Sequence, residues 1–269
     1  MEVETKFAPT CPAPLLQQLA EKHPELRGDY DLVLSHDVAS RPIEYEAAFA
    51  SFKGHPSNIV IIDNSAAEMG CSVGPGIVKR AAELLSPYAC VTIIVLPDVL
   101  MSRLKTLRAV ENAWHSPGWR WVFESGYGCM YVPQGETFED WCECLQGLAE
   151  TYEPGWIGIA KNVQDKLGTS RLHAIHVTEA LLPGAKIHLL GMSDDFVDDV
   201  LAAKHPKVVG MDSAVPLRLD EPLRIGMTGC PPRGSWWQDI ANDDDPRLKH
   251  MMIENLKRIK KWIQPWPAP

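Results

Sequence analysis

Residues 186–212 read KIHLLGMSDDFVDDVLAAKHPKVVGMD, and this stretch decides the fold. Two short apolar runs, 186–192 and 207–212, enclose a segment, 194–203, in which apolar residues recur at helical spacing. The runs are continuous rather than alternating, which is typical of parallel strands that are covered on both faces. The stretch therefore predicts a strand, a helix and a second strand parallel to the first.

The same alternation extends through most of the chain. Five further apolar runs are DLVLSHD (31–37), NIVIID (58–63), CVTIIVLPD (90–98), CMYVPQG (129–135) and WIGIAK (156–161). Amphipathic helical patterns cover 74–85, 137–149, 170–182 and, most clearly, 246–263. With PLRIGMTG (222–229) as the best candidate for an eighth strand, the pattern predicts a single-domain (β/α)8 TIM barrel over residues 1–269. An open doubly wound sheet is the alternative.

The composition indicates an ordinary globular protein. The chain has 269 residues, of which 45% are hydrophobic and 23% charged, which suffices for a sizeable core. The N-terminus has no basic stretch followed by an apolar one, and no apolar run reaches the roughly 18 residues of a membrane span, so we expect neither a secretory signal nor a membrane helix. Seven scattered cysteines favour a reducing compartment, so the expected location is the cytoplasm.

Positive charge gathers at one end of this acidic chain. The net charge is −9, yet residues 246–263 carry six lysines and arginines against Glu254 alone. Asp245 and Pro246 suit the cap and first turn of a helix there. The sequence therefore predicts a basic C-terminal helix that could contact phosphates.

Polar residues follow the predicted strands where each strand ends. In both candidate architectures, ligands bind at the carboxyl ends of the strands. These residues are His36, Asp37, Asp63, Asn64, Ser65, Asp98, Gln134, Lys161, Ser193, Asp212 and Ser213. Any one of them could simply cap a helix, but capping does not require acids at four strand ends. The set favours an active site in which one carboxylate is a nucleophile or base and another donates a proton.

Other site types have less support in the sequence. The chain has no GxGxxG, no Walker-type phosphate loop and no GxSxG elbow, which disfavours dinucleotide folds and α/β-hydrolases. A divalent metal held by His36, Asp37 and other acids stays an alternative. His188 lies within a predicted strand and is typical of a core residue, whereas His173 and His176 are typical of a helix surface.

In their order along the chain, the strand ends resemble the tRNA-guanine transglycosylase family, (β/α)8 enzymes that exchange guanine for a 7-deazaguanine base such as queuine. The resemblance covers roughly residues 30–220. It implies that Asp212 in GMDSAVPLR is the covalent nucleophile and that Asp63 in IIDNSAAE is the general acid/base. It also implies a base pocket formed by Asp98 in VLPDV, Gln134 and Gly135 in VPQG, and Gly158 in WIGIAK. The run Asn64, Ser65, Ala66 and Ala67 replaces the glycines of the family's DSGGFQ motif, and Asn64 and Ser65 are expected to contact the substrate.

One departure from the family bears on the partner. The tRNA enzymes carry a CxCxxC…H zinc site, but only Cys230 and His250 follow the nucleophile here, so we expect no zinc subdomain, no metal and no cofactor. The short chain resembles phage-type relatives that modify DNA in the host cytoplasm, so DNA is favoured over tRNA, with a 7-deazaguanine as small-molecule substrate. A homodimer is left open. The expected phosphate contacts are Lys257, Arg258, Lys260 and Lys261, and Trp236 and Trp237 are candidates for stacking on a base.

Two other functions remain open on the sequence alone. The first is a metal-dependent barrel hydrolase or lyase that acts on a small molecule and requires a divalent ion. The second is a non-catalytic barrel that binds nucleic acid without using Asp212.

Overall fold

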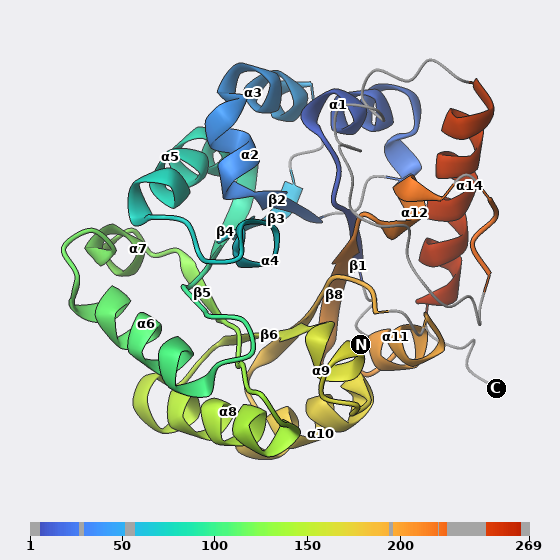
Figure 1. The fold of residues 1–269 in the computed structure, drawn as a ribbon. Helices are drawn as coiled ribbons and strands as arrows, with labels where there is room; N and C mark the ends of the chain where they lie inside the picture. The colour runs from blue at the N-terminus through green and yellow to red at the C-terminus, as the bar shows by residue number, and fades with distance from the viewer. Residues whose placement is uncertain are drawn as a thin grey trace.

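The computed structural model describes residues 6–26, 30–51, 57–193, 196–219, 221–224 and 246–264. Parallel strands form one eight-stranded sheet that curls into a nearly closed barrel, and helices lie outside it (Figure 1). The strands are β1 (Lys6–Pro9), β2 (Tyr30–Leu34), β3 (Ser57–Asp63), β4 (Ala89–Val95), β5 (Gly128–Tyr131), β6 (Trp156–Ala160), β7 (Lys186–Leu190) and β8 (Val208–Ser213). The predicted (β/α)8 barrel is confirmed, and the open doubly wound sheet is wrong.

The strand order aligns the carboxyl ends on one rim. Backbone pairing runs in the order β1, β8, β7, β6, β5, β4, β3, β2, and within the described residues no ladder joins β2 back to β1. Leu34 at the end of β2 pairs with Asp63 at the end of β3, and Pro9 at the end of β1 pairs with Ser213 of β8. Residues just after these ends therefore face one common mouth.

The predicted position of one strand is wrong. The strand that completes the barrel is β1, the four residues KFAP, which pair with β8. Residues 222–224 of the predicted eighth strand are not in a strand, and 225–229 lie outside the described residues. The 207–212 run therefore supplies the last strand of the barrel and not the seventh.

The helices follow the strands as the amphipathic patterns predict. They are α1 (Ala13–Lys22), η1 (Pro24–Leu26), α2 (Ser35–Ser40), α3 (Pro42–Ala50), α4 (Ala66–Met69), α5 (Pro75–Leu85), η2 (Ser86–Tyr88), α6 (Arg103–His115), α7 (Arg120–Glu124), α8 (Phe138–Tyr152), α9 (Asn162–Asp165), α10 (Arg171–Leu181), α11 (Phe196–Ala203), α12 (Val215–Arg218) and α14 (Pro246–Trp262). Thr137 caps α8 by accepting a hydrogen bond of 3.1 Å from the Asp140 amide. The predicted cap of α14, Asp245, lies outside the described residues.

The core has two layers because side chains alternate along each strand. On β3, Ile61 packs inside the barrel, whereas Val60 and Ile62 pack outward against the helices. By the same period of two, Asp63 at the end of β3 points back toward the barrel axis. The apolar filling of the barrel thus ends where the polar strand-end residues begin.

A β-bulge sets the inward face of β8. Ile187 of β7 pairs with Val208, but the next residue, His188, pairs with Gly210, so Val209 is extra on β8. A bulge of this kind re-aims the side chains beyond it. Gly210 comes to face the ring of Tyr30, and a Cβ at this position would lie 2.9 Å from Tyr30 Cε1. Asp212, two residues further on, consequently points into the barrel mouth.

The basic C-terminal helix α14 packs on the outside of the barrel. Its apolar stripe includes Met252, Leu256 and Ile259, which are buried, and the helix lies beside α12 (Figure 1). Lys257 and Lys261 are exposed on its other face. Among the described residues, no helix is both long enough and apolar enough to cross a membrane.

Candidate active site

A cavity of about 450 Å³ opens at the carboxyl ends of the strands. All eight strands contribute to its wall, from Thr10 after β1 to Asp212 and Ser213 of β8. The ionisable lining residues are Asp63, Glu68, Asp98, Lys161, Asp212 and Arg218. The structure thus brings together seven residues of the predicted strand-end set, and it adds the cationic Arg218. The seven are Asp63, Asn64, Asp98, Gln134, Lys161, Asp212 and Ser213.

The Asp212 carboxylate is held by hydrogen bonds from three sides. Its Oδ2 accepts from Thr10 Oγ1 at 3.0 Å, and its Oδ1 accepts from the Gly191 amide at 3.2 Å. Oδ1 also lies 2.9 Å from His188 Nε2. With 7% of its surface exposed, Asp212 is fixed in one orientation at the edge of the cavity.

His188, which the sequence analysis placed in the core, links Asp212 to Tyr30. Its ring is fully buried, and Tyr30 Oη lies 2.5 Å from Nδ1 and 3.0 Å from Nε2. A carboxylate only accepts hydrogen bonds, so His188 donates from Nε2 and Nδ1 accepts from the Tyr30 hydroxyl. The three side chains form one hydrogen-bonded chain across β2, β7 and β8.

Asp98 is bound on both oxygens by amide side chains. Oδ1 accepts from Asn64 Nδ2 at 2.8 Å, and Oδ2 accepts from Gln134 Nε2 at 2.7 Å. Burial raises the pKa of the Asp98 carboxyl to about 6, although these two hydrogen bonds act to lower it. Only 4% of the residue is exposed, so Asp98 mainly ties together the segments that follow β3, β4 and β5.

The raised pKa of Asp98 predicts a pH-dependent stability. Between about pH 4 and pH 6 the folded chain holds a proton on Asp98 that the unfolded chain releases, so the free energy of unfolding falls as the pH rises. The full fall in the free energy of unfolding is about 3 kcal/mol. Urea unfolding of the wild type and of Asp98→Asn at several pH values measures it, because asparagine does not titrate.

Asp98→Asn should be less stable at low pH, since its amide faces two hydrogen-bond donors. The deficit of the variant in free energy of unfolding should then shrink as the pH rises from about 4 to about 6, where the wild type loses stability. A deficit that stays constant across this range would show that Asp98 is ionised in the folded protein.

Asp63 is the carboxyl group best prepared for proton transfer. Burial raises the pKa of Asp63 well above its usual range, and the nearby carboxyls of Glu68, Asp212 and Asp98 raise this pKa further. One hydrogen bond, 2.6 Å from the Ser65 amide to Oδ1, acts in the opposite direction. Ser65 takes a left-handed backbone (φ 61°), which is strained for a residue other than glycine. That strain aims the Ser65 amide at Asp63.

Lys161, directly after β6, lines the cavity and carries a primary amine. Its Nζ lies 3.5 Å from Asp165 Oδ2 on the short helix α9. The Lys161 amide donates to the Leu190 carbonyl at 3.0 Å, which fixes its backbone to the end of β7. The sequence analysis named Lys161 among the strand-end residues but gave it no role.

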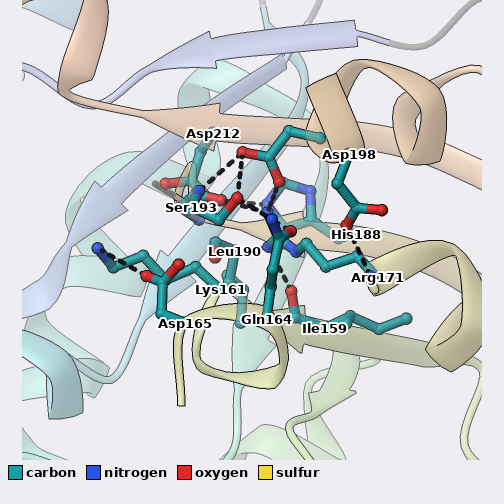
Figure 2. Close-up of polar contacts among 12 residues, drawn as sticks. Ile159, Lys161, Gln164, Asp165, Arg171, His188, Leu190, Ser193, Asp198 and Asp212 are labelled. Carbon is teal, nitrogen blue, oxygen red and sulfur yellow. Dashed lines mark hydrogen bonds and ion pairs between the residues drawn. The ribbon is translucent and has the colours of Figure 1, made fainter. Parts of the chain in front are cut away.

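A buried arginine that the sequence analysis missed supports this side of the cavity. Arg171, the first residue of α10, is fully buried and pairs with Asp199 at 2.7 Å. Its guanidinium donates to the carbonyls of Ile159, Leu190 and Gly191 at 2.6–2.8 Å (Figure 2). The Leu190 carbonyl belongs to the peptide whose amide, that of Gly191, binds Asp212. Arg171 therefore positions both the Lys161 backbone and Asp212.

Three predicted site residues do not line the cavity. A Cβ on Gly135 would lie 2.4 Å from the Trp141 amide nitrogen, so this glycine allows close packing against α8. A Cβ on Gly158 would lie 2.7 Å from Leu190 Cδ1, so Gly158 makes room for the barrel filling. Ser65 is fully buried and acts through its amide on Asp63. All three support the cavity by packing or by a backbone hydrogen bond and do not line it.

Other predicted contacts also lie away from the cavity. The predicted phosphate-binding residues Lys257, Arg258, Lys260 and Lys261 are on α14 and contribute nothing to the cavity wall. Arg258 donates to the Leu223 carbonyl at 3.3 Å, and Lys257 pairs with Glu254 at 3.0 Å. Trp236, Trp237 and Cys230 lie outside the described residues. His36 and Asp37 lie on α2 and not at the end of a strand.

Metal-binding donor atoms do not converge in the cavity among the described residues. The one group of three possible ligands found in those residues is His176, Glu179 and His205, none of which lines the cavity. Asp63, Asp98 and Asp212 instead accept hydrogen bonds from amide groups, and Asp212 also contacts the Thr10 hydroxyl and His188.

No protein-family model and no curated protein matches this chain. Solved structures do match. A putative fructose-1,6-biphosphate aldolase from Coccidioides immitis is 9% identical with a TM-score of 0.53, covering 97% of this chain and 87% of that chain. An aldolase/citrate lyase family protein from Burkholderia cenocepacia is 14% identical with a TM-score of 0.48, covering 78% and 88%. N-acetylneuraminate lyase from Mycoplasma synoviae is 10% identical with a TM-score of 0.47, covering 96% and 79%.

The transglycosylase activity predicted from the motifs is wrong. The similar structure with a TM-score of 0.53 is a putative aldolase, not a base-exchanging transferase. The geometry of the site gives a physical reason. Both oxygens of Asp98 already accept from Asn64 and Gln134 and only 4% of the residue is exposed, so little of the carboxyl group faces a base in the cavity. Asp212, the expected nucleophile, is likewise engaged on both oxygens.

Proposed function

We propose that this protein is an enzyme, a lyase or aldolase that breaks or forms a carbon–carbon bond next to a carbonyl group through an imine on Lys161. The observation that carries the proposal is that Lys161 lines the same cavity as Asp63, whose carboxyl pKa is raised by burial and by neighbouring acids. Lysine amines form imines with carbonyl substrates, and a carboxyl group with a raised pKa can both donate and accept protons near neutral pH.

The first half of the reaction forms the imine. The Lys161 ammonium passes a proton to Asp165, its 3.5 Å neighbour, and the free amine attacks the carbonyl carbon of the substrate. Asp63 in its neutral form then donates a proton to the departing oxygen, which leaves as water. A carbon–nitrogen double bond has replaced the carbonyl, and its positive charge attracts electrons from the adjacent carbon–carbon bond.

The second half breaks the carbon–carbon bond. The Asp63 carboxylate takes the proton from a hydroxyl whose carbon lies two bonds from the imine carbon. The bond between this hydroxyl-bearing carbon and the carbon next to the imine then breaks, and an aldehyde leaves. The electron pair passes to the imine and gives an enamine, which regains a proton from Asp63. Water then attacks the imine, and the product is released from Lys161. The reverse sequence builds the bond.

Acids outnumber cations in the cavity wall, so an anionic group on the substrate is inferred from the Arg218 guanidinium and not from the overall charge. The volume of the cavity, about 450 Å³, is in the usual range for small-molecule sites. Arg218 supplies a cation on the wall opposite the strand ends of β3 and β4, and a guanidinium suits a carboxylate. We infer a substrate of the 4-hydroxy-2-oxo acid class, in which the carboxylate, the carbonyl and the cleavable hydroxyl lie along one short chain.

The proposed reaction agrees with the lyase that the sequence left open as an alternative. It differs in using the Lys161 amine in place of a divalent metal. The fold is shared with an aldolase at a TM-score of 0.53. The chemistry, however, is argued from Lys161 and Asp63, because the acids of the cavity do not form a set of three metal ligands in the described part of the chain.

The test is release of a 2-oxo acid from a panel of 4-hydroxy-2-oxo acids of increasing length, and the reverse condensation with pyruvate and aldehydes. We expect cleavage of at least one member, unaffected by a chelator. Activity that a chelator abolishes, or no activity in either direction over the panel, would contradict the proposal.

A further inference from the structure

Three metal-binding side chains meet on the outer surface, away from the cavity. His176 and Glu179 lie one turn apart on α10, and His205 lies in the segment between α11 and β8. The rings of His176 and His205 are 5.2 Å apart, and His205 Nε2 is 3.7 Å from Glu179 Oε2. One ligand atom from each residue lies within 4.8 Å of the other two.

We propose that His176, Glu179 and His205 form a site for a divalent transition metal of the zinc type. Two imidazoles and a carboxylate are a ligand set that Zn²⁺ and its neighbours prefer over Mg²⁺ or Ca²⁺. Ligands around a tetrahedral Zn²⁺ are about 3.3 Å apart, so the present spacing of up to 4.8 Å has to contract by at most about 1.5 Å. His176 is exposed, and its side chain is free to rotate into place. This inference does not depend on the proposed function.

The protonation of His205 is compatible with metal binding. Burial lowers the pKa of His205, and His176 and Lys207 lower it further, although Glu179 acts to raise it. The ring is therefore mostly neutral at pH 7, as a ligand must be. Nδ1 accepts a weak hydrogen bond of 3.3 Å from the Lys207 amide, which is given up when the metal takes Nε2 and the ring proton moves to Nδ1. The affinity is therefore moderate.

The position of the site indicates a stabilising role. His205 directly precedes β8, so the site lies toward the amino-terminal face of the barrel, which in (β/α)8 proteins is associated with stability rather than catalysis. Helices α10 and α11 pack side by side (Figure 1). A bound ion would join α10 to the segment after α11, which already meet there in the Glu179–His205 ion pair and the His176–His205 ring contact.

The test is titration of the full chain with Zn²⁺ at pH 7.5, followed by calorimetry and by thermal unfolding. We expect one ion to bind, and free Zn²⁺ at about 100 times its Kd to raise Tm by about 5 °C. His176→Ala and His205→Ala should lose this binding. His173→Ala is the matched control, because His173 is an exposed histidine on the same helix outside the cluster.

The control separates the cluster from other zinc-binding groups. Cys71 and Cys90 are exposed free thiols, but they are the same in all four proteins. Loss of the ion and of the Tm shift in His176→Ala and His205→Ala, with both retained in His173→Ala, supports the site. No bound Zn²⁺ in the wild type, or equal binding in all the proteins, would overturn it.

Discussion

Replacing Lys161 with methionine is expected to lower kcat/KM of the lyase reaction by about 10³-fold or more. Methionine has similar length and keeps the packing after β6, but it has no amine to form the imine. Lys161→Arg should be equally inactive, because a guanidinium keeps the positive charge but is not a nucleophile. Steady-state kinetics on the cleaved 4-hydroxy-2-oxo acid measure both effects.

Lys166→Met is the matched control for the Lys161 variants. Lys166 is an exposed lysine five residues further along, and it does not line the cavity. Its loss should leave kcat and KM within about twofold of the wild type, as is usual for a surface substitution. Substantial activity in Lys161→Arg would show that Lys161 acts only by its charge, which contradicts an imine mechanism.

Arg171→Met is expected to lower the free energy of unfolding by roughly 3–5 kcal/mol. The change leaves the Asp199 carboxylate buried without its cation, with the hydrogen bonds from Ser193 remaining, and it removes one donor from each of three carbonyls at the ends of β6 and β7. A buried, unpaired carboxylate accounts for most of this cost. Urea unfolding at pH 7 measures it, and the fall should exceed that of any single surface substitution.

Arg120→Met provides the comparison with an exposed ion pair. Arg120 lies 3.7 Å from Glu124 on the surface of α7, and such pairs contribute little to stability. Arg171→Lys keeps the charge but cannot bind three carbonyls, so its free energy of unfolding should lie between those of the wild type and Arg171→Met. A loss of under about 1 kcal/mol in Arg171→Met would mean that Asp199 is neutral or solvated in the folded protein.

The sequence predicts the barrel well because burial of parallel strands leaves a strong pattern. Seven apolar runs between 31 and 212 correspond to strands β2–β8. The strand that was missed, β1, has only four residues and ends in a proline, so its sequence carries almost no strand signal. Its place in the sheet is set by pairing with β8, which no local pattern records.

The positions of the cavity acids follow from the sequence, but their partners do not. Asp63, Asp98 and Asp212 come to one mouth because parallel strands end on one rim. The pairing of Asp98 with Asn64 and Gln134 depends on side-chain geometry between three strand ends, so these amides were assigned to substrate contacts. His188 looked like a core residue, and only the bulge in β8 brings Asp212 to its Nε2. The resemblance of the strand-end motifs to those of the transglycosylase family stays a prediction.

Trapping of the imine tests the central proposal most directly. The protein is incubated with pyruvate, a small 2-oxo acid, and sodium borohydride, and its peptides are then analysed by mass spectrometry. Borohydride reduces an imine to a stable secondary amine, so we predict one pyruvate-derived adduct, on the peptide that contains Lys161, and none in Lys161→Met. An adduct-free protein, or adducts spread over surface lysines and unchanged in Lys161→Met, would contradict the account.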